Sequence, residues 1–216
     1  WGISGGADKF LDFIEQELMP YIDKKYRTND FNILSGHSLG GLLSVYALQT
    51  RSHLFQAYFA FSPSLWWHNE VIFKNAKNFF ANTPELNNYL YLNLANEGGI
   101  MLSAFNKYKQ LLQRYKPKGF NYNIELDNEE NHSTSAMVGH NKAYRQLYKK
   151  IQCPKNVIAQ GFPAIEQYYS QLSKTYGAEI KASYNTLAQV AGIAFDNKDI
   201  TAAINSYESI ILMFPH

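Results

Sequence analysis

A serine flanked by glycines, placed between a strand pattern and a helix pattern, restricts the fold of this chain more than any other feature. Residues 36–40 read Gly-His-Ser-Leu-Gly. They directly follow a hydrophobic β-type run at 31–35 and directly precede a helical stretch that begins near Leu42. A G-x-S-x-G segment in this setting is typical of a nucleophile elbow, a tight turn that presents a serine at the end of a strand. We expect Gly36 and Gly40 to be required there, because side chains at these positions would clash with the neighbouring strand and helix.

Short β-type runs alternate with helical patterns along most of the chain. The strand patterns cover residues 31–35, 57–62, 89–95 and 119–126. A helix is expected over 7–26, where Pro20 should kink it or start a new turn. Further helices are expected after the elbow and over 70–81, 101–115 and 135–149. This alternation predicts a mostly parallel sheet flanked by helices. The chemistry of such sheets lies at the carboxyl ends of the strands, so we expect functional residues in the loops that follow them.

The composition excludes several classes of protein. Of the 216 residues, 46% are hydrophobic and 18% are charged, which suits a chain with a buried core rather than a disordered one. The net charge of +2 gives no reason to expect nucleic acid or an anionic membrane surface as a partner. No apolar run approaches the about 18 residues that a membrane-spanning helix needs. The single cysteine, Cys153, excludes an internal disulfide and a cysteine-based metal site but leaves the cellular compartment open.

Two domains are expected. Residues 1–151 hold the alternation of strands and helices, and residues 152–162, with Pro154 and Gly161, are interpreted as a linker. The strand pattern stops there, and residues 163–216 form a helical appendix. Its helical patterns cover 163–176, 180–195 and 199–213.

The last two helical patterns fit a tetratricopeptide repeat loosely. If Pro215 is the terminal proline of such a repeat, its packing positions fall on Leu187, Val190, Ala191, Ala203 and Tyr207. The alternative is a plain helical hairpin docked on the main domain, since stable arrays need about three or more repeats. The chain begins at Trp1 and stops within a helical pattern, so we expect it to be a piece of a longer protein in which a signal peptide cannot be assessed.

A serine nucleophile needs a base, and His132 is the best candidate among six histidines. It lies in a polar loop just past the last strand pattern. In α/β-hydrolases the order along the chain is serine, acid, histidine, and the histidine follows the last strand. His37 lies inside the elbow and cannot reach the neighbouring hydroxyl in useful geometry, whereas His68 could border a pocket. The remaining histidines are expected in a surface loop, in a helix and at the C-terminus: His53, His140 and His216.

The acid of a triad should follow the strand before that histidine. Glu97 comes two residues after the strand pattern at 89–95 and is our first choice for the group that orients the imidazole. Three acidic residues close to His132 in sequence are its rivals: Asp127, Glu129 and Glu130. A serine–histidine dyad without an essential acid is the remaining alternative. The backbone N–H of Leu39, in the first turn of the elbow helix, is aimed at a developing oxyanion.

Several segments of the first 150 residues together resemble a known family. They are Gly-Gly-Ala-Asp-Lys-Phe at 5–10, Glu-Leu-Met-Pro-Tyr-Ile at 17–22, Gly-His-Ser-Leu-Gly-Gly at 36–41, Ser-Pro-Ser-Leu-Trp-Trp at 62–67 and Glu-Asn-His-Ser at 130–133. The sequence resembles the "Putative esterase" family, which includes esterase D-like enzymes and the IroE and Fes enterobactin esterases. The resemblance implies an α/β-hydrolase fold, a Ser38 nucleophile, a His132 base and ester hydrolysis. Some members carry helical-repeat tails, in agreement with the appendix. The upstream strands and the loop that supplies the second oxyanion donor in the family are missing from this chain.

The sequence therefore predicts an α/β-hydrolase core that cleaves a small carboxylic ester through an acyl-enzyme, without a cofactor or metal. Trp66, Trp67 and His37 are expected to line the substrate pocket. An acyltransferase with the same triad, or a binding protein with a degenerate site that works through the helical tail, are the alternatives. We also expect a protein partner or a dimer contact at that tail. The natural ester, the oligomeric state and the compartment stay open.

Overall fold

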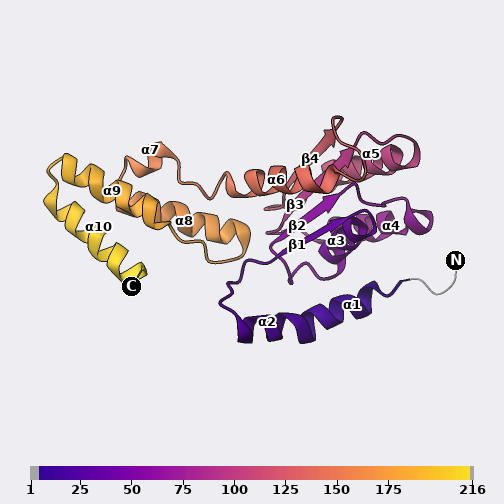
Figure 1. Ribbon diagram of the computed structural model, residues 1–216, viewed down its shortest axis with the longest axis horizontal. Helices are drawn as coiled ribbons and strands as arrows, with labels where there is room; N and C mark the ends of the chain where they lie inside the picture. The colour runs from indigo at the N-terminus through magenta and orange to yellow at the C-terminus, as the bar shows by residue number, and fades with distance from the viewer. Residues whose placement is uncertain (1–4, 215–216) are drawn as a thin grey trace. The chain divides into compact units, whose positions relative to one another are not determined.

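The computed structural model of the chain describes residues 5–214, and it divides into two compact units (Figure 1). The first unit ends at Arg145 and the second begins at Gln146. This boundary precedes residue 151, where the sequence pattern places the end of the first domain. The reason is that the last turn of helix α6 (Ser135–Tyr148) packs with the segments that follow it. There Leu147 is fully buried, and its carbonyl accepts a hydrogen bond of 3.2 Å from the Tyr176 hydroxyl.

The first unit is built on a four-stranded parallel sheet, as predicted. The strands are β1 (Ile33–His37), β2 (Ala57–Phe61), β3 (Tyr89–Ala95) and β4 (Asn121–Asp127), and they lie in the order β1-β2-β3-β4. Within the described chain, β1 is an edge strand that pairs with β2 alone. Because every strand runs in the same direction, the loops that follow the four strands emerge at one edge of the sheet.

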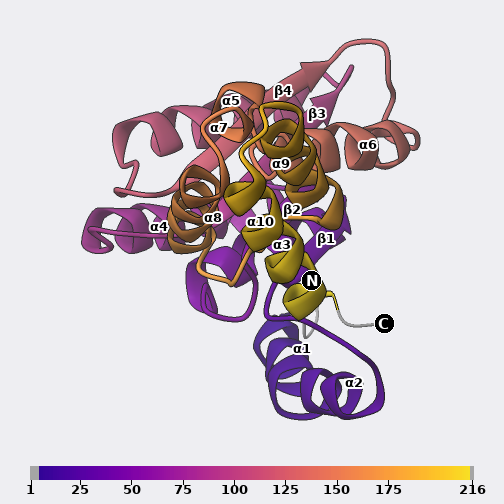
Figure 2. The same cartoon turned by 90° about the vertical axis from the view of Figure 1, so that its left-hand side faces the viewer.

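Helices cover both faces of the sheet. The helices against the sheet are α3 (Leu39–Thr50), α4 (Trp67–Asn82), α5 (Gly99–Arg114) and α6. The segments α1 (Ala7–Phe13), η1 (Ile14–Leu18, π-helical) and α2 (Met19–Lys25) precede β1, and Asp8 and Asp12 of α1 accept hydrogen bonds from Tyr46 and Arg51 at α3. Side chains that alternate along each strand explain the two layers. Tyr58 and Leu90 face the core shared with α3, α4 and α5, whereas Phe59 and Phe61 contact Tyr144 and His140 of α6. Figure 2 shows α6 on the opposite side of the sheet from α4 and α5.

Two local features differ from regular helix. Pro20 lies in the first turn of α2, directly after the π-helical turns of η1, which agrees with the expected new turn at this proline. The start of α4 is irregular, although its regular part agrees with the helix predicted over 70–81. His68, Asn69 and Glu70 all have left-handed φ angles, of 48°, 52° and 58°, so regular helical geometry begins only after them. The Glu70 carboxylate pairs with the Lys107 ammonium of α5 and so ties this turn to its neighbour.

The second unit is helical. Its helices are α7 (Lys155–Ile158), α8 (Phe162–Tyr176), α9 (Tyr184–Asp196) and α10 (Ile200–Met213), so the expected linker contains one short helix. Ser183 and Asp199 cap α9 and α10 by accepting hydrogen bonds from backbone N–H groups three residues on. Of the tetratricopeptide packing positions, Tyr207 is exposed and Pro215 lies outside the described residues; Leu187, Val190, Ala191 and Ala203 are buried.

Within residues 5–214 no helix combines the length and the apolar character required to cross a membrane.

Candidate active site

The candidate elbow is a strained turn held by backbone hydrogen bonds. Ser38 lies between β1 and α3 with φ 57° and ψ −115°, a conformation that a non-glycine residue adopts only under constraint. Its N–H donates to the Phe61 carbonyl at 2.9 Å, and its own carbonyl accepts from the N–H groups of Leu42 and Ser64, both at 3.0 Å. Because these contacts involve the backbone alone, they hold the turn whatever side chain residue 38 carries.

The glycines of the elbow do not all serve the same purpose. A Cβ atom on Gly36 would lie 2.0 Å from the Gly40 carbonyl oxygen, so no side chain fits there. At Gly40 itself an added Cβ would meet no described heavy atom within 4 Å. The expected clash is therefore confirmed for Gly36 and wrong for Gly40. The second close approach is at Gly41, where a Cβ would lie 3.1 Å from the Pro63 Cα atom.

We predict that Gly36→Ala lowers the free energy of unfolding by at least the roughly 1–3 kcal/mol that overpacking a core costs, because the methyl group meets rigid backbone. Gly40→Ala is the matched control. It should leave stability unchanged or raise it by up to about 1 kcal/mol, since alanine favours a helix over glycine. Chemical denaturation of the two variants measures both effects. Equal losses in the two variants would contradict this account of the turn.

His132 connects Ser38 to Glu97. The His132 Nδ1 atom lies 2.6 Å from Glu97 Oε1, and His132 Nε2 lies 3.1 Å from Ser38 Oγ. A carboxylate only accepts hydrogen bonds, so the Nδ1 atom must carry the proton and Nε2 is then free to accept from the Ser38 hydroxyl. The Glu97 side chain is 14% exposed, and its second oxygen, Oε2, is buried without a partner among the described residues. Among the described residues, His132 is therefore the hydrogen-bond partner of the Glu97 carboxylate.

The sheet brings these loops together. Ala95 and Asp127 are register partners at the ends of β3 and β4, so Glu97 and His132 follow neighbouring strands. The Asn96 N–H donates to the Glu130 carbonyl at 2.9 Å, which links the two loops. The His132 carbonyl in turn accepts from Ser135 Oγ at 3.1 Å and from His37 Nε2 at 2.7 Å.

That contact gives His37 a place that sequence reasoning did not foresee. The sequence suggests His37 as a pocket residue. In the structure its ring lies against the His132 ring, with centroids 4.5 Å apart, and its Nε2 bonds the His132 backbone. His37 therefore helps to hold the loop that carries the candidate base. A contact between residues so far apart in sequence has no local signal that could have revealed it.

The rival carboxylates have other surroundings. Asp127 is buried, and its Oδ2 accepts a hydrogen bond of 2.7 Å from the Lys142 ammonium. This hydrogen bond raises the pKa of Lys142 above its ordinary value. Glu129 is exposed on the loop, while Glu130 contributes its backbone carbonyl to the link with Asn96.

The remaining histidines lie away from the Ser38 hydroxyl. His53 pairs with Glu15 at 2.8 Å, and His68 is exposed in the left-handed turn of α4. His140 makes a second serine–histidine contact, with Nε2 2.7 Å from Ser35 Oγ, but its Nδ1 lies 2.7 Å from the Ala136 carbonyl rather than near a carboxylate. His216 lies outside the described residues.

A cavity of about 430 Å³ lies next to the elbow helix. Leu39, the residue after Ser38, forms part of its wall together with Trp67 and His68. Trp66 is not among the lining residues, but its ring lies 5.6 Å from that of Trp67, and its indole N–H donates to the Met101 sulfur at 2.9 Å. The polar lining includes Tyr46 and Asp8, which share a hydrogen bond of 2.8 Å and which no sequence motif had marked as site residues.

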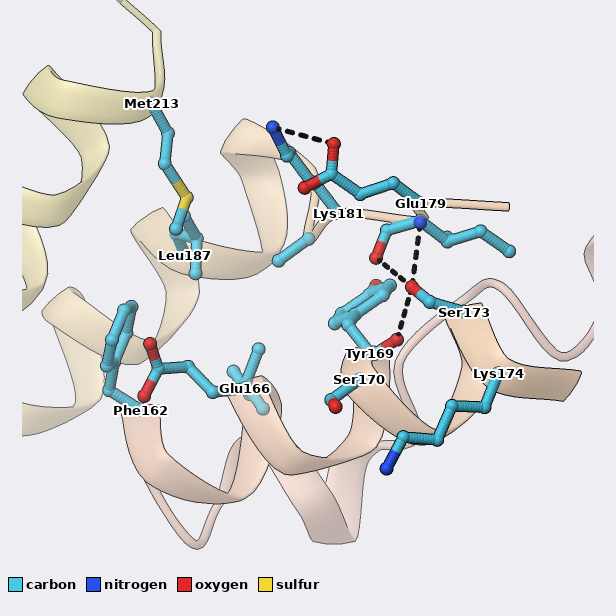
Figure 3. Close-up of a pocket in the computed structure, with 13 residues that line it drawn as sticks. Phe162, Glu166, Tyr169, Ser170, Ser173, Lys174, Glu179, Lys181, Leu187 and Met213 are labelled. Atoms are coloured by element: carbon cyan, nitrogen blue, oxygen red, sulfur yellow. Dashed lines mark hydrogen bonds and ion pairs between the residues drawn. The ribbon is translucent and has the colours of Figure 1, made fainter. Parts of the chain in front are cut away.

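A second cavity, of about 560 Å³, lies within the helical unit (Figure 3). Its wall combines apolar side chains such as Phe162 and Leu187 with an ion pair of 3.1 Å between Lys181 and Glu179. The Ser173 hydroxyl in this wall donates to the carbonyl of Tyr169, its own helix neighbour, and accepts from the Ile180 N–H, so it serves the local backbone.

The first unit defines the class of protein. A parallel sheet flanked by helices, with a serine turn after one strand and a histidine loop after the last, is an α/β-hydrolase fold. Residues 2–146 match the family described as "Putative esterase", and the chain belongs to that family.

Curated relatives and a solved structure agree with this assignment. The chain is 46% identical over 77 residues to a siderophore triacetylfusarinine C esterase of Aspergillus fumigatus, over 35% of this chain and 26% of the relative. It is 38% identical over 96 residues to the ferri-bacillibactin esterase BesA of Bacillus subtilis, over 44% of this chain and 33% of the relative. The chain thus spans about a quarter to a third of the length of these relatives.

Among solved structures, an IroE-like serine hydrolase from Shewanella oneidensis is 28% identical, with a TM-score of 0.78. The match covers 98% of this chain and 68% of that one, so the helices of the second unit also have counterparts there.

Proposed function

We propose that the protein is a serine esterase that hydrolyses a carboxylic ester through an acyl-enzyme intermediate. The observation that carries the proposal is the continuous contact from Glu97 through His132 to the Ser38 hydroxyl, at 2.6 Å and 3.1 Å. Nucleophile, base and orienting acid within hydrogen-bond distance are the arrangement that activates a serine. All three residues lie on loops at the edge of the parallel sheet where the strands end, which is where such sheets carry their catalytic groups, and this also supports the proposal.

Acylation begins with the Ser38 hydroxyl. Its Oγ attacks the ester carbonyl carbon while its proton passes to His132 Nε2, and one electron pair of the C=O bond moves onto the carbonyl oxygen. Glu97 stabilises the resulting imidazolium and keeps the ring in the tautomer that accepts the proton. The Leu39 N–H, in the first turn of α3 where N–H groups have no partner within the helix, is the donor that we assign to the oxyanion.

The intermediate collapses when the bond to the alcohol oxygen breaks and the leaving alkoxide takes the proton from His132. Water then attacks the acyl carbon and gives a proton to His132. The bond between that carbon and Ser38 Oγ breaks, the proton returns to Oγ, and the acid product leaves. We place the acyl or alcohol group in the cavity beside Leu39, with Trp67 as its wall and Trp66 packed against Trp67.

Siderophore esters are the first substrates to test, because the relatives are named as siderophore esterases. The test is a panel of p-nitrophenyl esters of graded chain length, assayed beside a cyclic triester of the siderophore type, with a fluorophosphonate probe for the activated serine. Hydrolysis together with probe labelling of Ser38 would support the proposal. Absence of both would overturn it. If added alcohol diverts the product from acid to ester, the protein is instead an acyltransferase.

The helical tail supports a second candidate role, self-association of two copies of this chain. Along α10 the side chains of Ile200, Ile204, Tyr207 and Ile211 are about half exposed or more, and their spacing puts them on one face of the helix. The α10 segment carries a single charged residue, Glu208, so few like charges oppose the contact of two such faces.

We predict that the double variant Ile204→Lys/Ile211→Lys is monomeric where the unmodified chain is a dimer, because it places like charges in the shared contact. Sedimentation velocity measures the oligomeric state. Asn205→Lys, an exposed position on a different side of α10, is the control and should leave the dimer intact. An unmodified chain that stays monomeric at high concentration would contradict the proposal.

A further inference from the structure

Ser64 lies in the segment Ser62-Pro63-Ser64-Leu65-Trp66-Trp67, which joins β2 to α4. It is 4% exposed, which is unusual for a polar side chain. Its N–H donates to the Ser38 carbonyl at 3.0 Å, and its own carbonyl accepts from the Trp67 N–H at 3.0 Å. Two backbone hydrogen bonds therefore hold Ser64 beside the elbow independently of its side chain.

The Ser64 hydroxyl contacts the reacting oxygen itself. Ser64 Oγ lies 3.3 Å from Ser38 Oγ, and either atom is a possible donor when this pair is considered alone. The rest of the site fixes the direction. Glu97 requires the proton on His132 Nδ1, so His132 Nε2 accepts the Ser38 proton. Ser38 has only that one proton, and hence Ser64 is the donor in its contact with Ser38.

We propose that Ser64 is a further catalytic residue, whose hydroxyl donates a hydrogen bond to Ser38 Oγ and stabilises the negative charge that develops on that oxygen. This inference rests on the proposed function, in which Ser38 is the nucleophile. The donated bond also occupies one lone pair of Ser38 Oγ and so directs the other toward the ester carbonyl. A separation of 3.3 Å is long for a hydrogen bond between hydroxyl groups, but catalytic hydrogen bonds of this kind shorten in the transition state.

Charge develops on Ser38 Oγ at two points of the reaction. In acylation the O–H bond breaks as the proton moves to His132, while the new C–O bond is only partly formed. In deacylation the C–Oγ bond breaks, its electron pair stays on Oγ, and the proton from His132 arrives to neutralise it. Ser64 keeps its own proton throughout, so the step needs no further reactant. Its hydrogen bond strengthens as the charge grows, which is the condition for lowering a barrier.

The alternative is that Ser64 only packs the loop. Because both backbone hydrogen bonds of Ser64 survive in Ser64→Ala, this variant removes the hydroxyl and little else. Ser64→Thr restores a hydroxyl at the same place. Ser44→Ala is the matched control, because Ser44 is also buried but donates to the Leu34 carbonyl at 3.2 Å, away from the Ser38 hydroxyl.

The experiment is stopped-flow hydrolysis of a p-nitrophenyl ester, in which the burst reports acylation and the steady state reports deacylation. We expect Ser64→Ala to slow both phases by about 10- to 10²-fold, less than the ~10²–10³ that a lost oxyanion-hole donor costs, with little change in substrate binding. Ser64→Thr should recover most of the rate, and Ser44→Ala should keep it.

Normal burst and steady-state rates in Ser64→Ala would overturn the inference. Equal losses in Ser64→Ala and Ser64→Thr would also overturn it, since a restored hydroxyl would then make no difference. Failure of the proposed function is distinguishable, because it would appear as an unmodified protein that neither hydrolyses esters nor reacts with a fluorophosphonate at Ser38.

Discussion

Ser38→Ala is expected to abolish ester hydrolysis and fluorophosphonate labelling while the fold is retained. Loss of the nucleophile of a serine triad lowers kcat by about 10⁴- to 10⁶-fold, because no other group forms the acyl-enzyme. The fold should survive because the strained turn is held by backbone contacts to Phe61, Leu42 and Ser64, which alanine also makes. Initial rates, intact-mass measurement of the labelled protein and a thermal unfolding curve check the three parts of the prediction.

Ser35→Ala is the control for that experiment. Ser35 also contacts a histidine ring, with its Oγ 2.7 Å from His140 Nε2, and it lies exposed on β1. The Nδ1 atom of His140 faces a backbone carbonyl, so no carboxylate stabilises an imidazolium there. Ser35→Ala should therefore keep both activity and labelling. If labelling is lost in Ser35→Ala and kept in Ser38→Ala, the nucleophile is Ser35 and the elbow assignment is wrong.

Glu97→Gln should lower kcat by about 10²- to 10⁴-fold and leave KM nearly unchanged. The amide has nearly the shape of the carboxylate, so the loop should keep its structure. What is lost is the negative charge 2.6 Å from His132 Nδ1, which matters chiefly when the imidazole becomes protonated in the transition state. Steady-state kinetics on one p-nitrophenyl ester separates this loss in kcat from a loss in binding.

The comparison variant neutralises the acidic run that rivals Glu97. Asp127→Asn/Glu129→Gln/Glu130→Gln should lose far less activity, because the Asp127 carboxylate is engaged by Lys142 and Glu129 points to solvent. Asp127→Asn breaks that pair, so the Glu129→Gln/Glu130→Gln double variant is assayed as well to separate lost stability from lost catalysis. A large loss in the double variant with normal rates for Glu97→Gln would move the acid to the His132 loop. Near-normal rates in every variant would leave a serine–histidine dyad.

Much of the fold could be predicted from the sequence because its elements are encoded locally. Period-two and helical spacing located each of the four strands within about two residues of its position in the sheet. The need for glycine at position 36 is also local, since the clashing Gly40 carbonyl belongs to the same turn. Local sequence signals fail where the backbone adopts a left-handed conformation without the glycine that usually marks it. No glycine marks the left-handed turn at His68, Asn69 and Glu70, so the sequence did not reveal it.

The sequence predicted the nucleophile and the base of the candidate site, but it left more than one candidate for the acid. Chain order and the rule that chemistry lies at the carboxyl ends of parallel strands select His132 and narrow the acid to Glu97 or the run after β4. The sequence ranks Glu97 first, because Glu97 follows the strand before the histidine loop, but it does not exclude the acidic run, because both loops leave the same edge of the sheet. Only the tertiary structure places Glu97 Oε1 against His132 and directs Asp127 to Lys142.

The alternation of strands and helices, the serine turn and the helical character of the tail are all encoded in short stretches of sequence, because each depends on residues close together in the chain. The tertiary structure alone decided which side chains meet across the sheet edge. Ser64 approaches Ser38 because β2 lies beside β1, and His37 reaches the His132 carbonyl because the loop after β4 is held over the elbow. Such contacts depend on how strands pair and helices pack, and no short segment of the chain carries that information.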